Sequence, residues 1–164
     1  MSHDKILREQ LAKVLDWNEA HADFHAAVDD FPTDQRGSVP KGFPYSAWQL
    51  LEHIRLALWD ILEFSRDARH KSPKWPEGYW PKSAEPPSAG AWDKSVSAVD
   101  DHLAGMRELM SDPSRDLFAP LPHGQGQTLL RQALLVGDHN AYHIGEFAIL
   151  RQVMGTWPPD RRDR

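Results

Sequence analysis

Apolar residues recur at intervals of three and four along four stretches of the chain, and no stretch alternates apolar and polar positions for long. This spacing is typical of one buried face of an α-helix, so it predicts an all-α fold. The expected helices cover about residues 4–30, 45–67, 89–110 and 128–154. We therefore expect one domain over residues 1–164, built as a four-helix bundle.

Two local patterns mark where the second helix begins and where the chain leaves it. Ser46 with Gln49 three positions later has the spacing of a capping box, which predicts a helix start at that serine. After this helix comes "KSPKWPEGYWPKSAEPPS" (71–88), whose five prolines prevent it from being helical over most of its length. Its length predicts a long crossover between the second and third helices, which would then run parallel.

Two histidines interrupt the apolar face of the fourth predicted helix. His139 and His143 are four residues apart, so their side chains share one face of the helix and can reach one ion. Burying two imidazoles costs free energy unless their nitrogens find partners, and a metal ion supplies such partners. The alternative is a pair of buried histidines satisfied by hydrogen bonds.

A third histidine lies on the apolar stripe of the second predicted helix. His53 follows Leu50 by one turn and precedes Ala57 by another. Neighbouring helix axes are about 8–10 Å apart, so the His53 imidazole can meet the other two. Three histidines leave a coordination position open, which is the arrangement of a catalytic rather than a structural zinc site.

The combination of "WQLLEHIRLALWD" (48–60) with "GDHNAYHIGEFAILRQVMG" (137–155) resembles the DinB/YfiT-like metalloenzyme family. Members of that family are four-helix bundles whose metal is held by one histidine of the second helix and an H-x-x-x-H-x-G-[QE] pair in the fourth. The resemblance implies that His53, His139 and His143 are the metal ligands. It also implies a divalent transition metal as cofactor, zinc or nickel first, with iron or manganese as alternatives.

The same resemblance implies a function. Relatives include thiol-dependent transferases and isomerases, so the implied activity is a metal-dependent transferase acting with a low-molecular-weight thiol, and the implied assembly is a homodimer. Two alternatives stay open, namely a metal-binding stress or sensor protein without turnover, and a helical bundle that associates with another protein.

Two carboxylates are candidate catalytic residues. Glu146 stands where the family motif often has Gln, one turn after His143, and it could orient that imidazole, bind a water on the metal or act as a base. Asp60 shares a face with His53 and could fix an imidazole tautomer or hold a cationic substrate. The alternatives are a partly exposed carboxylate for Glu146 and a salt bridge for Asp60.

Other side chains are weaker candidates for the site. His21 and His25 form a second pair at helical spacing on the first predicted helix, so His21 could be a further ligand, whereas a histidine near a helix end, such as His25, is often solvated. Four aromatic residues could wall a substrate pocket or only pack the crossover: Trp48, Trp75, Tyr79 and Trp80.

Composition excludes several classes of function. The chain contains no cysteine, so any thiol in its chemistry must come with a substrate or cofactor. The net charge is −5 and no basic stripe is present, which disfavours nucleic acid as a partner. No apolar run reaches the length of a membrane span and the first residues lack a signal peptide, so we expect a cytoplasmic protein with a small-molecule substrate.

Overall fold

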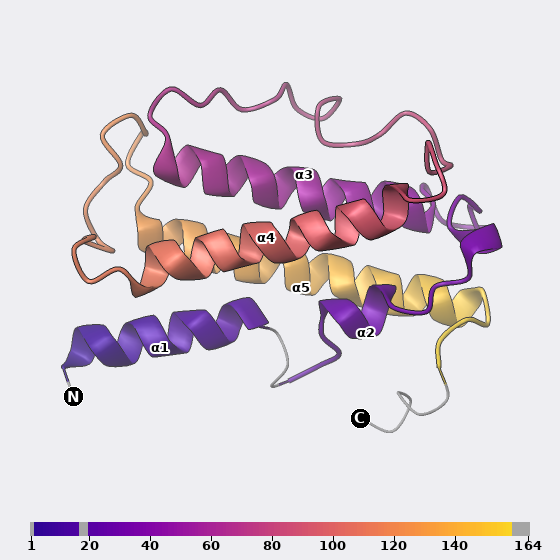
Figure 1. Ribbon diagram of the computed structural model, residues 1–164, viewed down its shortest axis with the longest axis horizontal. Coiled ribbons are helices and arrows are strands. Elements are labelled where there is room, and N and C mark those ends of the chain that lie inside the picture. Colours follow the sequence, from indigo (N-terminus) through magenta and orange to yellow (C-terminus); the bar gives the residue numbers. More distant parts are fainter. Residues whose placement is uncertain (1, 17–19, 159–164) are drawn as a thin grey trace.

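The computed structural model describes residues 2–16 and 20–158, and within these residues the chain forms five α-helices and no strand (Figure 1). The helices are α1 (His3–Asp16), α2 (Phe24–Val28), α3 (Ala47–Arg66), α4 (Ala91–Ser111) and α5 (Leu129–Val153), with a 3₁₀ turn, η1, at Thr33–Gln35. The predicted all-α class is confirmed.

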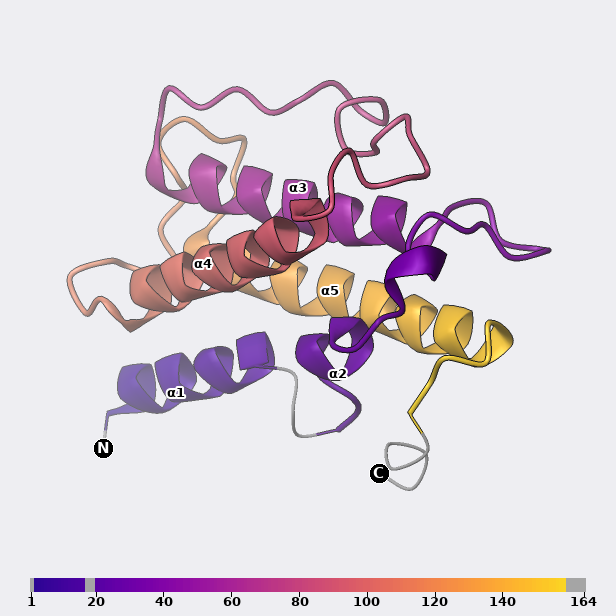
Figure 2. The same ribbon diagram turned by 45° about the vertical axis from the view of Figure 1, so that its right-hand side comes forward.

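The four long helices lie side by side. Helix α3 packs on α4 and α5, and α1 packs on the same two helices from the other side. Residues 67–90 run back along the length of α3, so α4 begins near the start of α3 and runs in the same direction (Figure 1). Helix α5 runs the opposite way, as the turned view also shows (Figure 2). None of the described helices is both long enough and apolar enough to cross a membrane.

The start of α3 is fixed by its own sequence. The Ser46 hydroxyl accepts a hydrogen bond from the Gln49 backbone N–H, and the Gln49 side chain accepts one from the Ser46 backbone N–H. This capping box confirms the predicted helix start. The same two side chains also donate to the crossover, at the carbonyls of Ala84 and Pro81, so this end of α3 anchors the chain that returns to it.

The prediction of one continuous helix over residues 4–30 is wrong. Helix α1 ends at Asp16, residues 20–23 are not helical, and α2 begins at Phe24; Asn18, expected on the inward stripe, lies outside the described residues. The physical reason is a new helix start, because the Asp23 carboxylate accepts a hydrogen bond from the Ala26 N–H as an N-cap. The apolar spacing continues across the break since α1 and α2 both pack against α5.

A buried arginine holds α2 against α5. The Arg151 side chain is almost fully buried, and its guanidinium donates to the backbone carbonyls of Ala27, Asp29 and Thr156. Five donors in a planar fork suit several carbonyls at once. The sequence gives no sign of this role, because Arg151 stands among the last residues of the helix, where an exposed cation is ordinary.

Candidate metal centre

The fold brings three histidines together from two helices. His53 lies in the first half of α3, while His139 and His143 lie one turn apart on α5, which packs against α3. His53 and His143 are buried, and His139 is half-buried. Each of the three offers one ring nitrogen to a group in which all such atoms lie within 4.8 Å of one another. Among the described residues, this is the group of histidine and carboxylate side chains placed to hold a metal ion.

The nitrogens that face one another are the Nε2 atoms. His53 Nε2 lies 3.1 Å from His143 Nε2 and 3.2 Å from His139 Nε2. The rings of His139 and His143 meet edge to face, with centroids 4.4 Å apart. The three rings therefore point their tips into one small volume.

The outer nitrogen of each ring faces an acceptor. His53 Nδ1 lies 3.1 Å from the Tyr79 carbonyl oxygen, and His143 Nδ1 lies 2.6 Å from Glu146 Oε2. His139 Nδ1 lies 3.0 Å from the Asn140 side-chain oxygen. A carbonyl or a carboxylate can only accept, so each Nδ1 carries the proton and donates it outward. In a neutral imidazole this leaves the Nε2 lone pair free to bind a metal.

The electrostatic setting keeps two of these rings neutral. Burial, together with the neighbouring imidazoles of His143 and His139, lowers the pKa of His53 to about 4, against the hydrogen bond to Tyr79. Burial also lowers the pKa of His139, more than its hydrogen bond to Asn140 raises it. Neutral imidazole is the form that binds metal ions, so these two rings are ready to coordinate at neutral pH.

Glu146 lies behind His143, on the side away from the three Nε2 atoms. Its carboxylate accepts the His143 Nδ1–H and also interacts with the hydroxyls of Tyr45 and Tyr142. Burial and this carboxylate raise the pKa of Tyr45, so the phenol stays protonated beside it. Of the roles considered for Glu146, orientation of the His143 ring is the one that this geometry supports directly.

An aromatic stack lies behind His53. The Trp80 ring is parallel to the His53 imidazole, with centroids 4.0 Å apart and 7° between the planes. The Tyr45 ring is stacked on Trp80 at 5.0 Å and 24°. The crossover therefore supplies the two groups that define the position of the His53 ring. They are the Trp80 ring that stacks on it and the Tyr79 carbonyl oxygen that accepts its Nδ1–H.

A cavity of about 450 Å³ opens onto the three histidines. Its remaining wall is mostly apolar and consists of Ala57, Asp60, Ile61, Trp75, Tyr79, Trp80 and Leu135. Three of the four aromatic residues singled out in the sequence thus line it, whereas Trp48 is buried in the core. Trp75 lies at the cavity and is largely exposed, 66% of its surface being accessible.

Asp60 lies in the cavity wall, but both of its oxygens are in use. Oδ2 accepts from the Tyr79 hydroxyl at 2.6 Å, and Oδ1 is 2.7 Å from His70 Nε2. Burial and Asp60 raise the pKa of Tyr79 to about 12, so its hydroxyl remains a donor. Asp60 therefore fastens two points of the crossover to α3, and its contact with His70 has the geometry of the salt bridge considered as the alternative for it.

The second histidine pair lies away from this centre. His21 and His25 are both exposed, and the break between α1 and α2 removes them from one helical stripe. His25 instead contacts the carboxylates of Asp29 and Asp100. Neither belongs to the group of described residues placed to hold a metal, so the structure does not support His21 as a further ligand.

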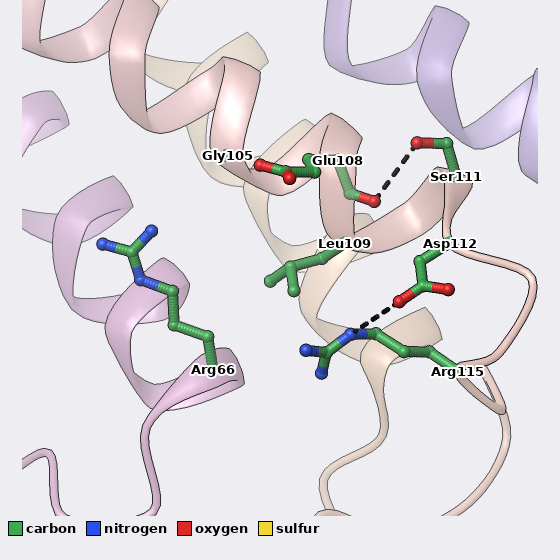
Figure 3. A pocket seen from close by; sticks show the side chains of 7 residues that line it. All are labelled: Arg66, Gly105, Glu108, Leu109, Ser111, Asp112 and Arg115. Carbon is green, nitrogen blue, oxygen red and sulfur yellow. Dashed lines mark hydrogen bonds and ion pairs between the residues drawn. The ribbon is translucent and has the colours of Figure 1, made fainter.

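A depression elsewhere on the surface has a different character (Figure 3). It lies between the ends of α3 and α4 and contains two arginines, Arg66 and Arg115. Arg66 is paired with Glu63 and Arg115 with Asp112. The depression thus mixes paired charges at the surface, in contrast to the converging ring nitrogens of the histidine cluster.

Sequence reasoning missed the supports of the histidines. Tyr45 lies just before the N-cap of α3, where no pattern of apolar spacing applies, and the Tyr79 acceptor is a backbone atom. Trp80 was included only as one of several crossover aromatics. The signal that was available is the density of aromatic residues in residues 71–88.

The donor set fits a divalent transition metal. Three neutral imidazole nitrogens suit zinc, nickel, copper or iron, whereas calcium and magnesium prefer oxygen ligands. Each imidazole donates its other N–H to an acceptor, as metal-bound histidines generally do.

Comparison with protein families agrees with this picture. A model of the DinB superfamily matches residues 16–147, which include all three histidines. None of the curated proteins and none of the solved structures matches the chain.

Proposed function

Because the chain belongs to the DinB superfamily and gathers three imidazoles at one point, we propose that it binds one divalent metal ion and uses it in a transferase reaction with a small thiol. The proposed ligands are His53, His139 and His143, each through Nε2. We assign the fold to the four-helix bundle with a long second crossover, in which α1, α3, α4 and α5 are the bundle helices and α2 is a short addition.

The single observation that supports the proposal of metal binding is that the Nε2 atoms of His53, His139 and His143 face one another. His53 Nδ1 and His143 Nδ1 both donate to oxygen acceptors, so neither ring has a second proton to share while it is neutral. Their Nε2 lone pairs nevertheless point at each other across 3.1 Å. Two acceptors at that distance repel unless a cation lies between them. A metal ion relieves this repulsion without the cost of charging a buried imidazole.

The cavity supports a reaction rather than storage alone. Three protein ligands leave a coordination position open, and the cavity reaches the same three side chains. A bound divalent ion would act there as a Lewis acid and lower the pKa of a thiol or a water molecule. The chain has no cysteine, so the thiol must come with a substrate.

The side chains that line the cavity indicate what kind of second substrate it would bind. No lysine or arginine is among the described residues that line the cavity, and most of these residues are aromatic or aliphatic. Such a lining favours an electrophile with an apolar or aromatic body over one held by a phosphate or a carboxylate. Asp60 is already occupied by Tyr79 and His70, so we assign it to the wall and not to proton transfer.

Two measurements test the proposal in order. Purified protein, first stripped and then reloaded with Zn²⁺, Ni²⁺, Fe²⁺ or Mn²⁺, is analysed by elemental mass spectrometry, and we expect about one equivalent of a transition metal per chain. The double variant His21→Ala/His25→Ala is the matched control, since it removes an exposed pair with the same spacing and should bind as the wild type does. Occupancy below about a tenth of an equivalent after reloading would refute metal binding and leave an ordinary packed bundle.

The second measurement separates an enzyme from a metal-binding protein without turnover. The loaded protein is incubated with several cellular thiols and a panel of apolar electrophiles, and thiol consumption is followed. Consumption that requires metal and is lost in His143→Ala supports the transferase. Full metal occupancy with no consumption across the panel favours the stress or sensor alternative.

A further inference from the structure

We propose that Tyr45 is a positioning residue that fixes the rings of His53 and His143 relative to each other, so that their Nε2 atoms meet at one point. The inference rests on the proposed metal function and concerns the residue that makes the site precise. It follows from two contacts of one side chain, the first made by its ring and the second by its hydroxyl.

The ring acts on His53 through Trp80. The Trp80 ring is stacked on the His53 imidazole at 4.0 Å and on the Tyr45 ring at 5.0 Å. Trp80 therefore has two stacking partners and cannot tilt without weakening its contact with one of them. Because its plane is within 7° of the imidazole plane, this stack also sets the tilt of His53.

The hydroxyl acts on His143 through Glu146. The Tyr45 hydroxyl interacts with the Glu146 carboxylate, which in turn accepts the His143 Nδ1–H at 2.6 Å. A carboxylate that is held in place determines where the ring that donates to it can lie. Tyr45 thus contacts the support of a histidine on α3 and the support of a histidine on α5.

The backbone around Tyr45 makes this link rigid. Tyr45 directly precedes Ser46, the N-cap whose capping box with Gln49 fixes the start of α3. The Ser46 hydroxyl also donates to the Ala84 carbonyl at 2.6 Å, and the Gln49 side chain donates to Pro81 at 3.0 Å. The Tyr45 ring and the crossover that carries Trp80 are therefore attached to the same helix end.

Tyr142 provides a matched comparison. Its hydroxyl also interacts with Glu146, but 66% of its surface is exposed and it makes no stack on Trp80 among the described contacts. If any hydroxyl on Glu146 were sufficient, removal of either one would have the same effect. Only Tyr45 joins both ligand supports, so only its removal should disturb the geometry of the centre.

The test uses the full chain and Co²⁺ as a spectroscopic probe. We compare the wild type with Tyr45→Phe, which keeps the stack, Tyr45→Leu, which removes both contacts, and Tyr142→Phe. Since loss of an outer support of a metal ligand weakens binding by about 10- to 100-fold, we expect that loss in Tyr45→Leu together with a changed visible Co²⁺ spectrum. Tyr45→Phe should fall between the wild type and Tyr45→Leu, and Tyr142→Phe should stay within about threefold of the wild type. Circular dichroism checks that the helices persist.

A readout without metal makes the result independent of the proposed function. Long-range ¹H–¹⁵N correlation spectra of the metal-free protein report which ring nitrogen of His143 carries the proton. We expect Tyr45→Phe to change the ring ¹⁵N shifts of His143 and Tyr142→Phe to change them less. A wild type that binds no Co²⁺ refutes the metal function, whereas the positioning role fails if the Tyr45 variants keep the wild-type His143 shifts, or if Tyr45→Leu keeps the affinity and spectrum of a Co²⁺-binding wild type.

Discussion

His53 Nε2 and His143 Nε2 lie 3.1 Å apart, although the two residues are separated by 90 positions in the sequence. Both rings donate their other N–H to oxygen, so two lone pairs face each other in a buried volume. This arrangement is unfavourable while both rings are neutral and metal-free, and favourable once a cation lies between them. The three rings are thus set in place by contacts outside the centre, and each of those contacts can be tested by substitution.

Removal of one imidazole should abolish tight metal binding. We expect His143→Ala and His139→Ala each to lower the affinity for Zn²⁺ by more than about 100-fold, because changes to groups that only support a ligand already cost 10- to 100-fold. Helical content should change little, since neither side chain is part of the apolar core. Competition with a chromophoric chelator measures the affinity, with His25→Ala as the control; a His143→Ala protein that retains full affinity would show that the ligands are assigned incorrectly.

Glu146 should matter through the hydrogen bond that it accepts. Glu146→Gln keeps an oxygen acceptor for the His143 Nδ1–H, so the metal should be retained, whereas Glu146→Leu removes the acceptor and should weaken binding by about 10- to 100-fold. Metal occupancy and thiol consumption are measured on the same preparations. If Glu146→Gln keeps its metal and loses turnover, the carboxylate also serves as a base; equal affinities in the two variants would contradict the orienting role.

The metal-free protein should lose stability as the pH falls below about 6.5. Burial lowers the pKa of His53 to about 4 in the folded state, so between that value and about 6.5 the unfolded chain takes up more protons than the folded one. The free energy of unfolding therefore decreases over this interval, by on the order of 1–3 kcal/mol from this residue. Urea titrations between pH 4 and pH 8 measure the decrease, and His53→Gln should make the profile flatter; identical profiles for the two proteins would contradict the prediction.

Replacement of two glycines of α5 by alanine should change the stability of the protein in opposite directions. A Cβ at Gly137 would lie 2.5 Å from Val14 Cγ1 of α1, so Gly137→Ala should destabilise the protein by about 1–3 kcal/mol through overpacking. Gly145 has open space around its Cβ position, and Gly145→Ala should stabilise the helix by about 0.5–1 kcal/mol. Thermal unfolding of both variants checks the pair, and a stable Gly137→Ala would mean that α1 does not pack so closely on α5.

Asp60 should contribute to stability more than to metal binding. Asp60→Asn weakens the hydrogen bonds that join α3 to Tyr79 and His70, and such bonds to a charged group contribute about 1.5–3 kcal/mol when buried and less at a partly exposed position. We expect a loss of about 1 kcal/mol and a Zn²⁺ affinity within about threefold of the wild type. Chemical denaturation measures the stability and chelator competition measures the Zn²⁺ affinity. If Asp60→Asn keeps its stability but loses turnover, Asp60 would again be a candidate catalytic residue.

The parts of the fold that follow from helical periodicity could be predicted from the sequence, and those that depend on single contacts could not. The bounds of α3, α4 and α5 follow from apolar spacing and from Ser46, and the spacing also places His53, His139 and His143 on faces that meet. The break after α1 was missed because the apolar stripe continues across it, and only the Asp23 cap distinguishes two helices from one.

The groups that hold the histidine rings in place could not be predicted from the sequence, for a related reason. Tyr45 and the Tyr79 carbonyl reach the histidines through the path of the chain outside the helices, and no periodic pattern describes that path. His21 and His25 show the opposite case, since they have the same four-residue spacing as His139 and His143 but are exposed to solvent. Spacing therefore identifies candidates, and only a partner from another helix distinguishes a ligand from a surface residue.

The acceptor for His53 is a main-chain oxygen, and this has a consequence for how the protein can diversify. A substitution at position 79 replaces the phenol that lines the cavity and removes its hydrogen bond to Asp60, but the main-chain carbonyl remains available to His53. The inner surface of the crossover can therefore vary in shape and polarity while the tautomer of the His53 ring is preserved. Selection for new substrates can act on this loop without changing the proposed metal centre beneath it.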